Sequence, residues 1–150
     1  MSNINGLDTL FNNLVSNVID NAPNIVEKNM KLVEGQAKLL APVDSGYLRN
    51  SITTNVTTKG SIVEGEVTTN CLYAPFVEFG VGKIGEGTYP YNVGNLIYRQ
   101  DGWTYCDSNG KFHYTHGYQA QPYMYPALED NKDKVVENIK KDIIKAMGGK

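Results

Sequence analysis

The sequence predicts an α+β fold with N-terminal amphipathic helices, antiparallel β-hairpins in the middle and a C-terminal helix packed on the sheet. Apolar residues recur every three or four positions before Pro42 and after Pro126, which is the period of a helix with one buried face. Between these regions, short segments rich in Thr and Val alternate and are separated by turn residues, as in hairpins. Helices segregated from an antiparallel centre define the α+β class.

The first helical region extends from Leu7 to Leu40. Its first part carries a wide apolar stripe formed by Leu7, Leu10, Phe11, Leu14, Val15, Val18 and Ile19. Pro23 predicts either a kink or a boundary at which Asn21 caps a second helix. A narrower seam then follows, formed by Val26, Met30, Val33, Ala37 and Leu40. Pro42 ends the helix, because the residue before a proline disfavours the α conformation.

Two hairpins are predicted in the middle of the chain. Asp44 or Ser45 can cap a short turn that leads into the first hairpin, whose strands cover residues 52–58 and 61–69 around Lys59 and Gly60. Its Thr-rich face is expected to be solvated. The second hairpin pairs residues 103–106 with residues 111–115 around an Asn-Gly turn. Residues 96–98 are predicted to form a brief strand.

The stretch from Tyr73 to Lys83 is predicted to begin with a short helix. Tyr73, Phe76 and Val77 follow helical spacing, and Pro75 suits a first helical turn. We expect these three spaced residues to face the core and Phe79 to face a neighbouring subunit, with the chain redirected by Gly80. A strand is the alternative, which Pro75 disfavours except at a sheet edge.

Four glycines follow at positions 80, 82, 85 and 87. They indicate a loop that is mobile or makes close backbone contacts, and we predict that it orders on contact with a neighbour. The last helix is expected to begin near Pro126. The apolar stripe of this helix consists of Leu128, Val135, Ile139, Ile143 and Met147.

Length and composition restrict the class of protein. With 150 residues, one domain covering residues 1–150 is expected. A net charge of −2 without a basic patch argues against tight nucleic-acid binding. The sequence contains no apolar run long enough to span a membrane, and its start resembles no secretion signal.

The sequence gives little support for a catalytic site or a metal site. Cys106, His113 and His116, together with Cys71, are a weak zinc candidate because no CxxC pair is present. The same residues are a weak candidate for a Cys-His-Asp hydrolase, because no family signature surrounds either cysteine. Glu78 and Glu86 have no evident partner, and we therefore expect no catalytic residue, metal or cofactor. Both cysteines are expected to be free thiols that can be replaced without loss of assembly.

Aromatic residues gather between Tyr89 and Tyr125. They suit a core or a subunit interface, and an alternative is a ligand-binding module in which Trp103 and nearby tyrosines bind glycan or peptide.

Three blocks in order, Ala41 to Ile52, Tyr73 to Lys83 and Gln121 to Leu128, resemble the head–tail joining family of tailed phages. These neck or tail-completion proteins are similar to the minor tail component of lambdoid phages. Ser45 stands where the family often has Thr. The segment from Tyr91 to His116 resembles an elaboration present in only some members.

The resemblance implies a non-enzymatic virion protein, assembled in the host cytoplasm and located in the neck or tail. It implies a ring, with six-fold symmetry favoured, that contacts neck, connector and tail-tube proteins while DNA passes through without specific binding. The residues that it suggests for subunit or partner contacts are Phe79, Gly80, Gly82, Lys83, Tyr89, Pro90, Tyr91, Pro122, Tyr123 and Tyr125. The residues that it suggests as structural are Pro42, Asp44, Ser45, Gly46, Leu48, Tyr73, Ala74, Phe76, Val77, Glu78, Pro126, Ala127 and Leu128.

Overall fold

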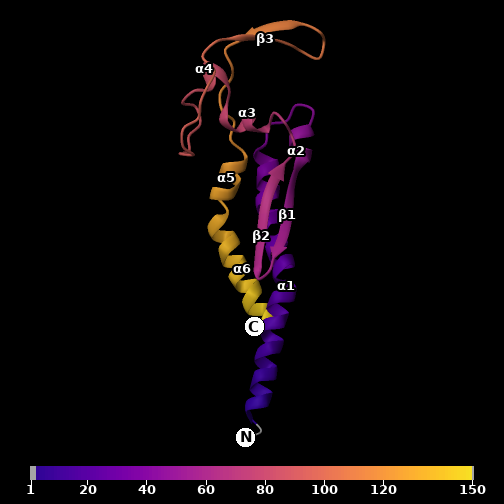
Figure 1. The fold of residues 1–150 in the computed structure, drawn as a ribbon. Helices are drawn as coiled ribbons and strands as arrows, with labels where there is room; N and C mark the ends of the chain where they lie inside the picture. Colours follow the sequence, from indigo (N-terminus) through magenta and orange to yellow (C-terminus); the bar gives the residue numbers. More distant parts are fainter. Residues whose placement is uncertain (1–2, 150) are drawn as a thin grey trace.

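A single long helix forms the axis of the molecule (Figure 1). In the computed structural model, which describes residues 3–149, helix α1 runs without a break from Asn3–Leu40. Pro23 lies inside it, so the predicted boundary at this position is wrong. The Asn21 side chain caps no second helix and instead donates a hydrogen bond of 2.7 Å to the carbonyl oxygen of Asn17. Proline removes one helical hydrogen bond, and the elements packed on α1 beyond residue 24 stabilise the helix despite this loss.

The first hairpin packs against α1. Helix α2 (Tyr47–Ser51) leads into β1 (Ile52–Lys59), which pairs with β2 (Ile62–Thr69) in antiparallel register from Ile52↔Thr69 to Lys59↔Ile62. The predicted hairpin is therefore confirmed, and its burial alternates along β1. At Gly65 a Cβ atom would lie 2.5 Å from Val26 Cγ1, so only glycine permits β2 to approach α1 this closely.

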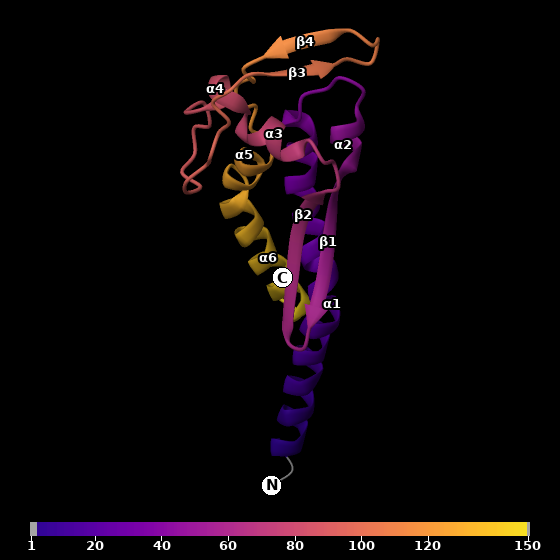
Figure 2. The same ribbon diagram turned by 45° about the horizontal axis from the view of Figure 1, so that its top comes forward.

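The C-terminal region forms two helices where the sequence predicted one. They are α5 (Met124–Glu129) and α6 (Lys132–Ala146), and the Asn131 side chain between them donates to the carbonyl oxygen of Ala127. Both helices pack against α1. The Lys28 ammonium lies 2.9 Å from the Asp142 carboxylate and links α1 to α6. The fold class is α+β, as predicted, with α6 packed mainly along α1 and lying beside β2 (Figure 2).

The segment between the hairpin and α5 caps one end of the molecule (Figures 1 and 2). It contains α3 (Ala74–Phe79), α4 (Gly82–Gly85) and a second hairpin formed by β3 (Trp103–Cys106) and β4 (Phe112–Thr115). The β3–β4 hairpin and the helix at 74–79 were predicted. The brief strand predicted at residues 96–98 is absent, and these residues form no regular structure.

The buried core lies where the C-terminal half of α1 meets α2, α3, α5 and the first strand. Its members are Val33, Ala37, Ala41, Leu48, Ile52, Cys71, Ala74, Tyr123, Ala127 and Val135. Among the described residues, no helix combines the length and the apolar character needed to span a bilayer.

Candidate functional site

A buried carboxylate joins α3 to the start of α5. The side chain of Glu78 accepts hydrogen bonds from the main-chain N–H groups of Tyr123 at 2.8 Å, Met124 at 2.9 Å and Tyr125 at 3.1 Å. The first N–H groups of a helix have no partner within the helix, and a negative charge there is favourable. No side chain of α5 itself caps this end, so Glu78, which is only 5% exposed, supplies the missing acceptor.

Tyr89 provides a fourth hydrogen bond to the same carboxylate. Its hydroxyl donates to Glu78 Oε1 at 3.2 Å. Burial, followed by the negative charge of Glu78, raises the pKa of Tyr89 far above its ordinary value. The pKa of Tyr123 is also raised, first by burial and then by Glu78. Both hydroxyls therefore stay protonated at neutral pH, and the carboxylate is fully occupied by donors.

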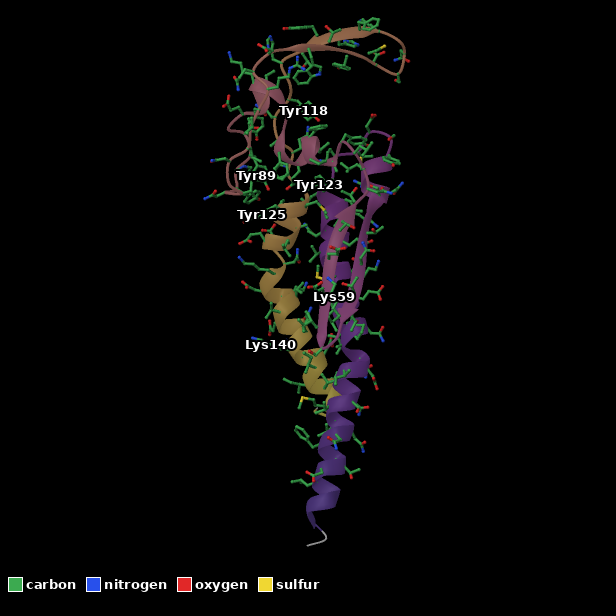
Figure 3. All side chains as sticks on the ribbon, in the orientation of Figure 1. Lys59, Tyr89, Tyr118, Tyr123, Tyr125 and Lys140 are labelled. Carbon is green, nitrogen blue, oxygen red and sulfur yellow. The ribbon has the colours of Figure 1, made fainter. Side chains whose placement is uncertain are left out.

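An aromatic chain extends from this carboxylate. The rings of Phe79 and Tyr89 are 4.9 Å apart, those of Tyr89 and Tyr91 are 5.5 Å apart, and those of Tyr91 and Tyr125 are 4.5 Å apart. The ring planes are tilted or edge-on, which is the favourable arrangement for aromatic pairs. Figure 3 shows Tyr89, Tyr123 and Tyr125 gathered around the start of α5. This aromatic chain of four rings holds the loop that follows Gly87 against α5.

An open, mainly apolar groove of about 570 Å³ lies beside this aromatic chain. It runs between β2, α1 and α5. The residues that line it are Met30, Val33, Gly65, Glu66, Val67, Glu78, Phe79, Tyr89, Val93, Met124, Tyr125 and Leu128. Methionine and aromatic side chains are the residue types that most often form adaptable protein-binding surfaces.

The glycine-rich loop is held by close backbone contacts in the single chain. Val81 and Tyr118 exchange two main-chain hydrogen bonds of 3.0 Å each. A Cβ atom at Gly82, where φ is +68°, would lie 2.2 Å from the carbonyl oxygen of His116, so a side chain cannot fit there. The sequence allowed either a mobile loop or a loop with close backbone contacts, and the structure shows close backbone contacts for residues 80–85. The single chain therefore already supplies main-chain hydrogen-bond partners for this loop.

A family model described as "Bacteriophage HK97-gp10, putative tail-component" matches residues 7–80. The matched half of this chain belongs to that phage tail-component family. It contains α1 from residue 7 onward, α2, the first hairpin and α3, and it ends two residues after Glu78. The searches of curated proteins and of solved structures found no match.

The family match covers part of the resemblance noted in the sequence. The block from Ala41 to Ile52 lies within the matched residues, as does the block from Tyr73 as far as Gly80. The block from Gln121 to Leu128 lies outside them, but the Glu78 carboxylate binds the main chain of this third block. The hydrogen bonds of Glu78 thus join the phage tail-component half to the C-terminal helices.

Several residues expected at an interface of this tail component are placed differently. Tyr123 is 1% exposed and belongs to the core, so its assignment to a contact surface is wrong. Gly80 and Gly82 are buried in the contact with residues 116–120. The expected residues that keep part or all of their surface exposed are Phe79, Lys83, Tyr89, Pro90, Tyr91, Pro122 and Tyr125.

The buried face of α3 also differs from the expected one. Phe76 is 53% exposed and Tyr73 is exposed, whereas Ala74 and Glu78 are buried. Val77 packs against the core as expected, and Phe79 lies half-buried in the groove of its own chain. The prediction of a helix was therefore correct, but the helix buries a different face from the one expected. Glu78 lies on the buried face because its carboxylate accepts hydrogen bonds from the N–H groups at the start of α5.

The remaining residues suggested as structural divide into two sets. Leu48, Pro126 and Ala127 are buried, and Gly46 precedes α2 with φ of +82°, which favours glycine. The set that lies half-buried or exposed is Pro42, Asp44, Ser45 and Leu128. The hydroxyl of Ser45 accepts a hydrogen bond of 3.4 Å from the Tyr47 N–H, so Ser45 supports the turn before α2 as predicted.

The cysteines and histidines are dispersed. Cys71 lies in the core, and Cys106 is exposed on β3. His113 Nε2 lies 2.8 Å from Asp107 Oδ2, and this contact is the main cause that lowers the pKa of Asp107. Among the described residues, no cluster of His, Cys, Asp and Glu has the geometry of a metal site.

Sequence reasoning missed the role of Glu78. One signal was present: the segment from Gln121 to Tyr123, just before α5, offers no Ser, Thr, Asp or Asn as a cap. A helix start without a local cap needs an acceptor from elsewhere in the chain. Glu78, a single charge between Val77 and Phe79 in an otherwise apolar stretch, was the candidate for that acceptor.

Proposed function

We propose that this chain is a neck or tail-completion subunit that assembles into a closed ring, with six-fold symmetry favoured, and joins the phage tail to the head connector. The proposal extends the structural role in a phage tail that follows from the family. In this role the subunit contacts itself and the neighbouring connector and tail-tube proteins, and it carries out no catalysis. Assembly would take place in the host cytoplasm before incorporation into the virion neck.

The observation that carries this proposal is the groove between β2 and α5. It is open to solvent and mainly apolar, and aromatic and methionine side chains line it. Concave, mainly apolar surfaces of this kind are common binding sites on proteins. Subunits of a ring repeat one head-to-tail contact, in which a surface of one copy fills a different surface of the next.

The polar groups around the groove favour a protein occupant over a small ligand. Small-ligand sites combine an apolar lining with a few free polar groups that orient the ligand. In this groove the buried carboxylate of Glu78 is already engaged by three main-chain N–H groups and the Tyr89 hydroxyl. The remaining lining supplies mainly surface area and shape, which suits packing against another protein. Glycan or peptide binding by the aromatic residues is the alternative, which the experiment below separates.

The charge of the chain is compatible with a channel for DNA. A net charge of −2 leaves no excess of cations to neutralise phosphates. Because phosphate neutralisation dominates protein–DNA affinity, DNA would pass without being retained.

The test uses the purified full-length chain, with negative-stain imaging and native mass spectrometry. We expect rings from the wild type. Leu128→Asp places a charge at the exposed rim of the groove and is expected to abolish ring formation without unfolding the subunit. Thr57→Asp, on the outward face of β1 and outside the groove, is the matched control and should still form rings.

Head–tail joining is then measured in a phage that lacks its own copy of this protein. The wild type and Thr57→Asp should restore infectious particles, and Leu128→Asp should not. A wild-type chain that stays monomeric at all concentrations and does not restore joining would overturn the proposal. Binding of glycans or peptides by that monomer would support the alternative.

A further inference from the structure

The first third of α1 projects beyond the rest of the molecule. The last turn of α6 lies against α1 near Asn21 and Asn24, and the first buried residue of α1 is Ile25. Residues 3–20, named here the extension, continue past this point for about 27 Å at the rise of an α-helix. Figures 1 and 2 both show the extension free of contact with α6 and with the first hairpin.

The extension carries a large apolar surface that none of the described residues covers. Leu7 is 68% exposed and Phe11 is 66% exposed. The other exposed apolar side chains are Leu10, Val15 and Ile19. At roughly 100 Å² each, these five side chains expose about 500 Å², near the largest patches that soluble monomers retain. The extension is the continuation of a longer helix, so what it lacks is a partner for its apolar side chains.

This apolar face continues an interface that already exists within the chain. At 100° per residue, Phe11, Val15 and Val18 fall on the same face as Ile25 and Asn29, which are buried where α1 meets α6. Inside the molecule α6 covers this face. Helix α6 does not reach the extension, so no helix of this chain packs on the apolar face there. Another helix is needed to cover that face.

The stripe is wide enough for two helices rather than one. Leu7, Leu10 and Leu14 form one seam with steps of three and four. Phe11, Val15 and Val18 form a second seam beside it. Together with Ile19 they cover about 180° of the helix surface, whereas a two-stranded coiled coil uses a single seam.

The charges of the extension restrict the kind of partner. Residues 6–24 contain Asp8 and Asp20 and no lysine or arginine. Helices that lie on lipid surfaces are rich in basic residues on their polar face, and nucleic-acid-binding helices require cations. A second copy of the same helix meets no charged residue within either seam. Asp8 lies outside both seams but inside the apolar arc, about 20° from its edge at Ile19.

We propose that the extensions of several copies of this chain pack side by side into a helical bundle, each contacting two neighbours through its two seams. Two copies alone would bury about 1,000 Å², which is at the lower limit for a specific interface. Contact with a neighbour on each side doubles the number of interfaces per copy, as a closed ring provides. The bundle surface is separate from the groove beside α5.

Disulfide trapping in the full-length chain tests the geometry. In a Cys106→Ser background, which removes the exposed thiol, Phe11→Cys is compared with Asn13→Cys. The second position lies about 160° around the helix from the first. Under mild oxidation we expect Phe11→Cys to form disulfide-linked copies and Asn13→Cys to remain unlinked.

Sedimentation equilibrium supplies the second measurement. The double variant Leu10→Asp and Phe11→Asp should weaken self-association at least about tenfold. At a concentration at which both proteins are monomeric, its thermal midpoint should equal that of the wild type, because both side chains are exposed in the single chain. Asn13→Asp should leave self-association unchanged. Equal trapping at both positions, trapping at neither, or unchanged association of the double variant would overturn the inference.

A mixed sample tests whether the extension binds in the groove of a neighbouring copy instead. Copies with Phe11→Cys are combined with copies with Leu128→Cys, and crosslinks only between the two kinds would place the extension in a neighbour's groove and overturn the bundle. The outcome also separates this inference from the proposed function. Rings that persist in the double variant reject the bundle alone, whereas trapped extensions without rings or head–tail joining reject the proposed function alone.

Discussion

The Glu78 carboxylate accepts a hydrogen bond of 2.8 Å from the Tyr123 main-chain N–H, a residue 45 positions later in the chain. This contact links the half of the chain that belongs to the phage tail-component family to the C-terminal helices. It also places one wall of the groove, because Glu78, Phe79 and Met124 all contribute to that surface. The Gln121 main-chain N–H also donates a hydrogen bond of 2.8 Å to the Val77 carbonyl oxygen, and together these contacts hold α3 against the start of α5.

Replacing Glu78 tests this dependence. Glu78→Gln keeps the shape but turns an amide donor toward main-chain donors, so at least one buried N–H loses its acceptor. We expect a loss of about 2–4 kcal/mol in the free energy of unfolding, measured by urea denaturation. Glu86→Gln is the control, because this exposed carboxylate accepts one hydrogen bond from Gln100, and the change should remain within about 0.5 kcal/mol. Equal midpoints for the two variants would contradict the role of Glu78.

Truncation of aromatic residues distinguishes core from surface around the same site. Tyr123→Ala removes a ring that is fully buried and should lower the free energy of unfolding by about 3–5 kcal/mol. Phe76→Ala removes a ring that is more than half exposed and should change it by less than about 1 kcal/mol. Thermal melts of the two variants provide the comparison. The sequence placed Phe76 in the core from its spacing, and the family resemblance placed Tyr123 at a contact surface, so the expected order is now reversed. A lower melt for Phe76→Ala than for Tyr123→Ala would restore the original assignments.

Acid sensitivity should arise at Glu34. Burial would raise its pKa, but hydrogen bonds from Lys38, Lys31 and the Thr54 main-chain N–H outweigh burial and lower it from 4.5 to about 2. A lowered pKa in the folded state contributes stability above pH 4.5 that is lost as the pH falls toward 2. Allowing for the solvent around both lysines, the contribution is on the order of 1–2 kcal/mol.

Urea midpoints of the wild type and Glu34→Gln check this expectation. The wild type should be more stable at pH 7, and the difference between the two should shrink below pH 4.5. Glu137→Gln, in an exposed pair with Lys141, should behave like the wild type at every pH. A difference for Glu34→Gln that is constant from pH 7 to pH 2 would show that charge is not the cause.

The two cysteines should differ sharply in reactivity and in tolerance. Cys106 is exposed, so it should react rapidly with a thiol reagent in the folded protein, and Cys106→Ser should be neutral within about 0.5 kcal/mol. Cys71 is buried in the core and should react only after unfolding. Cys71→Ser places a hydroxyl in this apolar core and should cost about 1–3 kcal/mol. Rapid labelling of both thiols in the native state would contradict this placement.

Local patterns were sufficient to predict much of the fold. The first hairpin follows from Thr and Val alternation and a turn at Gly60, and the second follows from the Asn109–Gly110 turn. These elements form from contacts between residues that are close in sequence. The position of α3 was also predictable, because Pro75 and Gly80 mark its beginning and end.

The remaining features depend on contacts that sequence spacing does not encode. Helix α1 continues through Pro23 because the first hairpin, α5 and α6, which are distant in the sequence, pack against α1 after this residue. The buried face of α3 is set by hydrogen-bond donors at residues 123–125, and no local period reveals that demand. Tyr123 resembled its exposed neighbour Tyr125 in the sequence, and only the packing of α5 separates them.

The paired Val81 and Tyr118 close the chain at the base of the segment that carries the β3–β4 hairpin. The entropic cost of closing such a loop grows slowly, by about 0.6 kcal/mol for each doubling of its length. The β3–β4 hairpin within this segment can therefore lengthen, shorten or be exchanged during evolution while the core beneath it keeps the same structure. A peptide tag inserted between Asn109 and Gly110 is expected to leave the urea midpoint unchanged, which would make this hairpin a natural position for displaying foreign sequence on a virion component.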